Sequence, residues 1–228
     1  MNWQKVWSQI ATRSDNAMEQ VGRTVQNIPI SAESLAEIVA DIVQKTGIKP
    51  TDSVLDVCCG NGVLTQKVAT YCANIVGIDG EKKLIERANQ DFSAENITYI
   101  VGDAFEVKSL VNQSFDVIIL YFSFQYFDSL EKGENIISSL LSLLNPHGCI
   151  LLGDVPDGNK IAVFYPNLLH RIRYWISCLT GKNAMGKFWK YEEIAHICKK
   201  YNATVKLCPQ KETLPYSYYR VDYLICGI

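Results

Sequence analysis

The sequence predicts an α/β fold: a doubly wound, mostly parallel seven-stranded sheet with an antiparallel last strand. From residue 53 to 154, short apolar runs alternate with stretches of helical apolar spacing, and such alternation with short connections is typical of a parallel sheet. The last two apolar runs are separated only by a loop, and strands without a crossover helix pair antiparallel. The chain has 228 residues and 48% hydrophobic content, which suits one domain spanning 1–228.

The first thirty residues precede this alternation. Segment 1–30 is expected to form two amphipathic helical stretches, with Trp3 and Trp7 among their apolar positions, that cover the mouth of the domain. Ser31 is a plausible N-cap for the next helix, and Gly47 is expected to end it.

The alternating elements then come in order. The first strand, 53–57, enters a tight turn through Gly60 and Gly62, which let another molecule lie against the backbone. Further strands are expected at 74–79, 97–102, 115–121, 149–154, 203–208 and 220–226, and helices at 62–71, 81–91, 128–144 and 190–201.

An interval at 156–189 interrupts this order. It is too long for an ordinary connection between a strand and a helix, and it is rich in aromatic residues. We expect it to be a lid insertion between strands five and six that helps to enclose a substrate.

Composition argues against several classes of protein. The net charge is −2 without long basic blocks, so nucleic acid is not expected as a partner. No apolar run has membrane-spanning length, and the N-terminus lacks the apolar core of a signal peptide, so a cytoplasmic location is expected. The eight cysteines are scattered without a CxxC pair, which favours small buried side chains over a metal site. Monomer and homodimer both stay open.

The glycine turn suits one of two ligands. In the dinucleotide pattern GxGxxG, Gly or Ala would stand at Thr65. Asp56, at the end of the first strand, would also set a carboxylate beside phosphate charge. A cationic ligand therefore fits this turn better than a dinucleotide does.

The stretch Asp56-Val57-Cys58-Cys59-Gly60-Asn61-Gly62 resembles the first motif of the class I S-adenosylmethionine-dependent methyltransferases, an acid followed by a GxGxG loop, with Cys58 at the first glycine. Later motifs also match: Asp79 ends the second strand, Gly102-Asp103-Ala104 comes after the third, and Pro146-His147-Gly148 precedes the fifth. The resemblance implies S-adenosyl-L-methionine as cofactor and S-adenosyl-L-homocysteine as product. It also implies cofactor contacts from Asp56, Cys58, Gly60, Asn61, Gly62, Asp79, Gly80, Asp103, Ala104 and Tyr121, with the ribose on Asp79 and the adenine on Asp103 and Ala104.

Residues 121–127, which begin with the last residue of the fourth strand, bear on the acceptor. The D/N-P-P-Y/F signature of family members that methylate planar amines is absent from this segment. The leading hypothesis is therefore methyl transfer to an oxygen nucleophile on a small molecule, such as a sugar, a glycan precursor or a natural product. An N- or C-methyltransferase, an NAD-type oxidoreductase and a non-catalytic S-adenosylmethionine-binding module stay as alternatives.

Two residues are candidates for proton transfer. His170, in the lid, is the histidine best placed to be a general base, although a structural hydrogen bond would explain it equally well. Asp154, at the end of the fifth strand, is a second base or a substrate anchor, or else a cap of the next turn. Gln125, Tyr126, Arg171 and Tyr218 are the predicted substrate contacts.

Overall fold

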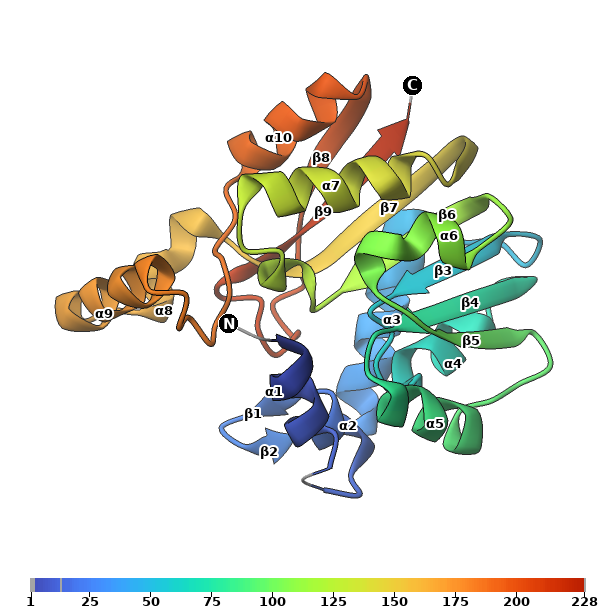
Figure 1. The fold of residues 1–228 in the computed structure, drawn as a ribbon, viewed down its shortest axis with the longest axis horizontal. Coiled ribbons are helices and arrows are strands. Elements are labelled where there is room, and N and C mark those ends of the chain that lie inside the picture. Colours follow the sequence, from blue (N-terminus) through green and yellow to red (C-terminus); the bar gives the residue numbers. More distant parts are fainter. Residues whose placement is uncertain (1–2, 13, 228) are drawn as a thin grey trace.

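The computed structural model describes residues 3–12 and 14–227, with side chains from Val6 onward. The side chain of Trp3, one of the predicted apolar positions, lies outside the described part. A seven-stranded sheet runs through the molecule in the order β5-β4-β3-β6-β7-β9-β8 (Figure 1). Its strands are β3 (Ser53–Val57), β4 (Asn74–Asp79), β5 (Ile97–Val101), β6 (Phe115–Tyr121), β7 (Leu144–Pro156), β8 (Ala203–Pro209) and β9 (Arg220–Gly227).

The predicted strand directions are confirmed. The first five strands of the sheet pair in parallel, and β9 lies antiparallel between β7 and β8. The predicted helix 128–144 is too long, because α7 (Leu130–Leu141) stops earlier and Leu144 already pairs with Phe115. The strand predicted at 149–154 therefore begins at residue 144.

Helices cover both faces of the sheet (Figure 1). Alternate residues of the inner strands point to opposite faces, as a pleated strand requires: Ile118 and Leu120 pack in one core, and Val117 and Ile119 in the other. The first core also holds apolar side chains of α6 (Val107–Leu110), α7 and α10 (Tyr191–Lys200), and the second holds those of α3 (Ala32–Thr46) and α4 (Val63–Ala69). Helix α5 (Lys82–Asp91) packs beside β4 and β5.

The N-terminal segment holds the expected helices, α1 (Trp3–Ile10) and α2 (Ala17–Gln20), and a hairpin that was not expected. The hairpin joins β1 (Thr24–Val25) to β2 (Ile28–Pro29). Gln26 and Asn27, its two turn residues, have positive φ angles of 52° and 63°, as a type I′ turn requires. Strands of two residues are too short to show the alternation that predicts a strand.

The insertion forms α8 (Ile161–Phe164) and α9 (Leu168–Leu179), which project from the body of the molecule (Figure 1). Its base is held by an aromatic cluster in which Tyr174, Phe188 and Tyr219 are buried together. Trp189, at the end of the insertion, is completely buried in the first core.

A buried polar network ties α3 to the antiparallel end of the sheet. The Nζ atom of Lys45 lies 2.5 Å from Oδ2 of Asp41 and 2.6 Å from Oδ2 of Asp222. Asp222 also accepts hydrogen bonds from the backbone N–H of Asp154 and from Nε2 of Gln210. Burial alone would lower the pKa of Lys45, but the charges and hydrogen bonds of the two carboxylates outweigh it and raise that pKa.

Candidate functional site

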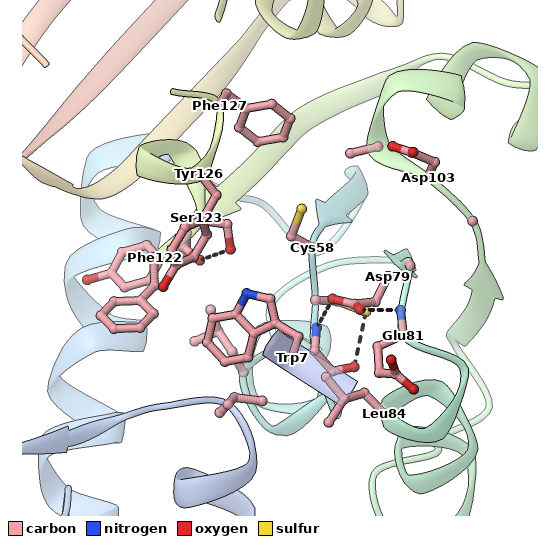
Figure 2. A pocket seen from close by; sticks show the side chains of 18 of the residues that line it. Trp7, Cys58, Asp79, Glu81, Leu84, Asp103, Phe122, Ser123, Tyr126 and Phe127 are labelled. Atoms are coloured by element: carbon pink, nitrogen blue, oxygen red, sulfur yellow. Dashed lines mark hydrogen bonds between the residues drawn. The ribbon is translucent and has the colours of Figure 1, made fainter. Parts of the chain in front are cut away.

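A cavity of about 500 Å³ opens at the carboxyl ends of β3, β4, β5 and β6, the edge at which open parallel sheets bind their ligands. Figure 2 shows acidic side chains on one side of it and aromatic side chains on the other. The polar side is lined by Asp79, Gly80, Glu81, Gly102, Asp103 and Ala104. The aromatic side is lined by Trp7, Tyr121, Phe122, Tyr126 and Phe127.

The glycine loop forms the floor of the cavity. Gly60 and Gly62 have left-handed φ angles of 61° and 79°, which glycine adopts without the steric cost that other residues meet. A Cβ atom on Gly60 would lie 2.6 Å from Cγ1 of Val21. The N-terminal segment therefore packs directly on the loop and helps to close the cavity.

Asn61, between the two glycines of the loop, fixes this arrangement. Its side chain is completely buried, and its Nδ2 atom donates hydrogen bonds to the carbonyl oxygen of Ala17 and to Oε1 of Gln20, each at 2.9 Å. Both acceptors belong to α2. Asn61 thus joins the loop to the N-terminal segment.

Strained backbone gathers near the carboxyl ends of three neighbouring strands, β3, β6 and β7. Cys58, Phe122 and Asp154 have φ angles of 58°, 65° and 57°, a conformation that costs roughly 1–2 kcal/mol for a residue other than glycine. Cys58 and Phe122 line the cavity. Such strain clusters at functional sites, and the angle at Cys58 explains why a glycine would suit that position.

Asp79 is held rigidly at the end of β4. Its Oδ2 accepts a hydrogen bond from the backbone N–H of Gly60, and its Oδ1 accepts one from that of Glu81, each at 2.9 Å (Figure 2). Burial raises the pKa of the Asp79 carboxyl, and these two hydrogen bonds offset part of the rise. Each oxygen keeps further lone pairs for a ligand in the cavity.

Asp103 lines the cavity beyond the end of β5. It comes after β5 and caps the short helix η1 (Ala104–Glu106) by accepting a hydrogen bond from the backbone N–H of Phe105 at 2.9 Å. Its side chain is exposed. Asp103 can therefore reach a polar ligand edge that lies at the rim.

Asp56 lies beneath the loop, outside the residues that line the cavity. Its carboxyl group is buried and accepts a hydrogen bond from Oγ1 of Thr65 at 2.6 Å. Burial raises the pKa of Asp56 to about 7, although the hydrogen bond from Thr65 and the charge of Arg23 act against this rise. The ordinary pKa of an aspartate is 3.8, so the folded chain binds this proton more tightly than the unfolded chain does.

The raised pKa of Asp56 predicts a specific pH dependence of stability. A carboxyl whose pKa is higher in the folded state stabilises the fold below its unfolded pKa, and this contribution is lost as the pH rises through its folded pKa. Between about pH 4 and 7, the free energy of unfolding of Asp56→Asn should therefore rise relative to that of the natural chain. The slope should approach about 1.4 kcal/mol per pH unit, measured by urea denaturation at several pH values.

A surface variant separates this effect from the general titration of carboxylates. Asp91→Asn removes a partly exposed carboxylate that pairs with Arg87 on α5, and its unfolding free energy should stay parallel to that of the natural chain. Parallel curves for Asp56→Asn as well would contradict the raised pKa.

The aromatic side of the cavity is covered by α1. The rings of Trp7 and Tyr126 meet edge to face with centroids 5.6 Å apart, and Figure 2 shows Trp7 between Phe122 and Leu84. Burial raises the pKa of Tyr126 to about 12. Its hydroxyl is therefore protonated at neutral pH and is a hydrogen-bond donor rather than a base.

One buried cation also lines the cavity. The guanidinium of Arg23 lies 5.4 Å from the ring centroid of Tyr121 and 5.7 Å from that of Phe122, within the range of cation–π attraction. Its side chain is buried. A carboxylate on a ligand would suit this charge.

The cavity brings together part of the predicted site. Of the predicted cofactor contacts it includes Cys58, Gly60, Asp79, Gly80, Asp103, Ala104 and Tyr121, and of the predicted substrate contacts it includes Tyr126. It does not include Asp56, Asn61, Gly62, Gln125, Arg171, Tyr218, His170 or Asp154.

The two predicted proton acceptors lie elsewhere. His170 is exposed on α9, in the projecting insertion. Asp154 is buried in the polar network, where its Oδ1 accepts a hydrogen bond from Nε2 of Gln210 and its Oδ2 lies 3.6 Å from Nη1 of Arg220. Neither side chain is brought to the cavity.

Several lining residues were not predicted as site residues: Trp7, Val21, Arg23, Glu81, Leu84, Phe122, Phe127 and Lys132. The expectation that segment 1–30 covers the mouth of the domain pointed to the first three. In the part of the chain that the structure describes, no group of three or more His, Cys, Asp or Glu residues is placed to hold a metal ion. The eight cysteines are free thiols.

Three comparisons relate this geometry to known proteins. A family model described as a methyltransferase domain matches residues 54–148. The "Probable cobalt-precorrin-6B C(15)-methyltransferase (decarboxylating)" of Methanococcus vannielii is 34% identical over 168 residues, which cover 72% of this chain and 83% of that protein. The 23S rRNA (uracil(1939)-C(5))-methyltransferase RlmD of Legionella pneumophila is 32% identical over 97 residues, 40% of this chain. The match covers only 22% of RlmD.

A solved structure confirms the fold over the full length of the chain. The N-methyltransferase NodS of Bradyrhizobium japonicum, in complex with S-adenosyl-L-homocysteine, superposes with a TM-score of 0.64 at 15% sequence identity. The superposition covers 100% of this chain and 99% of NodS.

Proposed function

Because the chain belongs to the class I S-adenosylmethionine-dependent methyltransferases, we propose that it methylates an oxygen nucleophile on a small-molecule acceptor in the cavity beside Tyr126. S-adenosylmethionine is the methyl donor. The observation that carries the proposal is a cavity with acidic groups on one side and aromatic side chains, including Tyr121 and Tyr126, on the other.

The residues of the polar side fit the cofactor. The rigid carboxylate of Asp79 suits a pair of ribose hydroxyls, which donate strong hydrogen bonds to a charged acceptor. Asp103 suits the exocyclic amine of an adenine at the rim. Arg23, a buried cation on the same cavity, suits the carboxylate of the methionine portion.

The side chains around the bound acceptor determine which nucleophile can react. The cofactor supplies a methyl group on a sulfonium, so the protein has chiefly to align the acceptor and exclude water. None of the described residues that line the cavity is a histidine, and the hydroxyl of Tyr126 is a donor. An acceptor oxygen that is already ionised near neutral pH, such as a carboxylate or the oxygen of an acidic phenol, therefore suits this site best. The proposed acceptors include natural products and sugar acids that carry such a group.

A small acceptor also suits the shape of the cavity. Trp7 and Val21 of the N-terminal segment line one part of it, which leaves less access for a folded polynucleotide than an open groove would. The match with the rRNA methyltransferase covers only 22% of that protein. Its substrate therefore does not carry over.

Removing one hydroxyl tests the proposed role of Tyr126. Tyr126→Phe should lower turnover by about 2- to 15-fold, the effect of one hydrogen bond of about 0.5–1.5 kcal/mol, with cofactor affinity unchanged. Tyr218→Phe removes the same group from an exposed side chain outside the cavity and should leave turnover unchanged. Equal turnover of Tyr126→Phe and the natural enzyme would refute the role of this hydroxyl.

An acceptor screen tests the proposed reaction itself. The enzyme is incubated with S-adenosylmethionine carrying a ¹³C-labelled methyl group and with panels of carboxylic acids, phenols, amines and carbon acids. We expect product methyl signals typical of an ester or an aryl ether. Labelled amines alone would refute the oxygen nucleophile.

A carbon nucleophile is the second candidate. It is favoured by the relative from Methanococcus vannielii, whose name assigns methylation at a carbon. The same screen distinguishes the two candidates, because a methyl group on carbon has a different chemical shift from one on oxygen.

A further inference from the structure

Helix α9 exposes an unusual number of large apolar side chains. Trp175 is 56% exposed and Leu179 is 88% exposed. The other exposed apolar residues of this helix are Leu168, Leu169, Ile172 and Ile176. Scattered single apolar residues are normal on a protein surface, but a contiguous apolar patch marks an interaction site.

These six side chains form one stripe along the helix. At 3.6 residues per turn they fall within an arc of about 120°. Arg171 and Arg173 flank the stripe on opposite sides, and Tyr174, which is buried against the body of the protein, points the opposite way. The stripe therefore faces away from the molecule, as the projection of α9 in Figure 1 also shows.

The charge of this segment is one-sided. Residues 158–190, here called the α9 arm, contain six Lys and Arg residues and no Asp or Glu, although the whole chain has a net charge of −2. One of the six, Lys187, is paired with Glu193. The remaining cations are Lys160, Arg171, Arg173, Lys182 and Lys190.

We propose that the α9 arm docks on the surface of an anionic phospholipid bilayer, with α9 lying in the interface and its apolar stripe turned toward the acyl chains. An amphipathic helix with Trp and Leu on one side and basic residues flanking them is suited to this position, and anionic lipids attract the excess positive charge. None of the described helices is long and apolar enough to cross a membrane, so the contact is peripheral. Two α9 arms packed against each other would bring their positive charges together, which disfavours the same arm of a second copy as the occupant.

Flotation with lipid vesicles tests the proposal on the full chain without any methyl acceptor, so its outcome is independent of the proposed reaction. We expect the protein to float with phosphatidylcholine vesicles that contain phosphatidylglycerol, and to float much less at high salt or with phosphatidylcholine alone. Trp175→Glu should lower the partition coefficient by more than ten-fold. Arg173→Gln should lower it about five-fold, the effect of one basic residue near an anionic surface.

A matched variant controls for the added charge. Ile28→Glu places the same acid at an exposed apolar position of the β1–β2 hairpin and should float like the natural chain. Absence of flotation with anionic vesicles would overturn the proposal, as would equal flotation of Arg173→Gln and the natural chain. A lipid-free dimer that Trp175→Glu converts to a monomer would instead identify the stripe as a contact between copies.

Discussion

The variant Asp79→Ala is expected to bind S-adenosyl-L-homocysteine about 10- to 150-fold more weakly than the natural chain. The proposed contact consists of hydrogen bonds from ribose hydroxyls to a carboxylate, and such bonds contribute about 1.5–3 kcal/mol. The two amides that hold this carboxylate, those of Gly60 and Glu81, keep it in one orientation before any ligand arrives. The dissociation constants are measured by calorimetric titration.

The loss of Asp79 also frees the amide of Gly60, so the loop itself has to be checked. Thermal unfolding of the ligand-free variant reports any loosening, and Asp91→Ala, which removes an aspartate from the surface of α5, is the matched control for binding. An unchanged affinity of Asp79→Ala would refute the placement of the ribose. A weakened affinity with an intact unfolding transition would support it.

The second large effect is expected on stability. Lys45→Met should lower the free energy of unfolding by about 3–5 kcal/mol, the cost of leaving buried charges without their partner. Asp222 is completely buried and Asp41 nearly so, and Lys45 contacts both. Urea denaturation at neutral pH measures the loss.

A solvent-exposed pair provides the comparison. Lys82 lies 3.6 Å from Glu86, and both side chains are mostly exposed, so Lys82→Met should change the free energy of unfolding by less than about 1 kcal/mol. Adding Asp222→Asn to Lys45→Met should restore part of the stability, because one uncompensated charge is removed. Equal effects of Lys45→Met and Lys82→Met would show that the buried network does not stabilise the fold.

The parallel part of the fold was predictable because its signals are local. The runs 53–57, 74–79 and 115–121 are bounded by turn residues, and the structure ends its strands at the same residues. The β1–β2 hairpin was missed, since its two-residue strands carry no alternation. The end of α7 was also missed, because pairing of Leu144 with Phe115, a distant residue in the chain, decides it.

The cofactor side of the site was more predictable than the acceptor side. Asp79 ends β4, and Asp103 follows the adjacent parallel strand β5. Strand order alone brings such residues to one edge of the sheet. Trp7 reaches the cavity only through the packing of α1 over Tyr126, which no local pattern reveals.

The expected lid illustrates the same limit. Its aromatic content predicted an enclosing role, but Tyr174 and Phe188 pack against Tyr219, and Trp189 packs in the core. These contacts hold the base of the α9 arm and leave His170 exposed on α9. The composition of a segment indicates that its aromatic side chains will be buried. It does not indicate against which surface they pack.

The cavity beside the glycine loop is proposed to bind an adenosyl sulfonium rather than a dinucleotide. Calorimetric titration of the natural chain with S-adenosyl-L-homocysteine and, separately, with NAD tests it most directly. We predict saturable binding of S-adenosyl-L-homocysteine with one site per chain, and no heat of binding with NAD. Binding of NAD without binding of S-adenosyl-L-homocysteine would show that the glycine loop holds a dinucleotide instead.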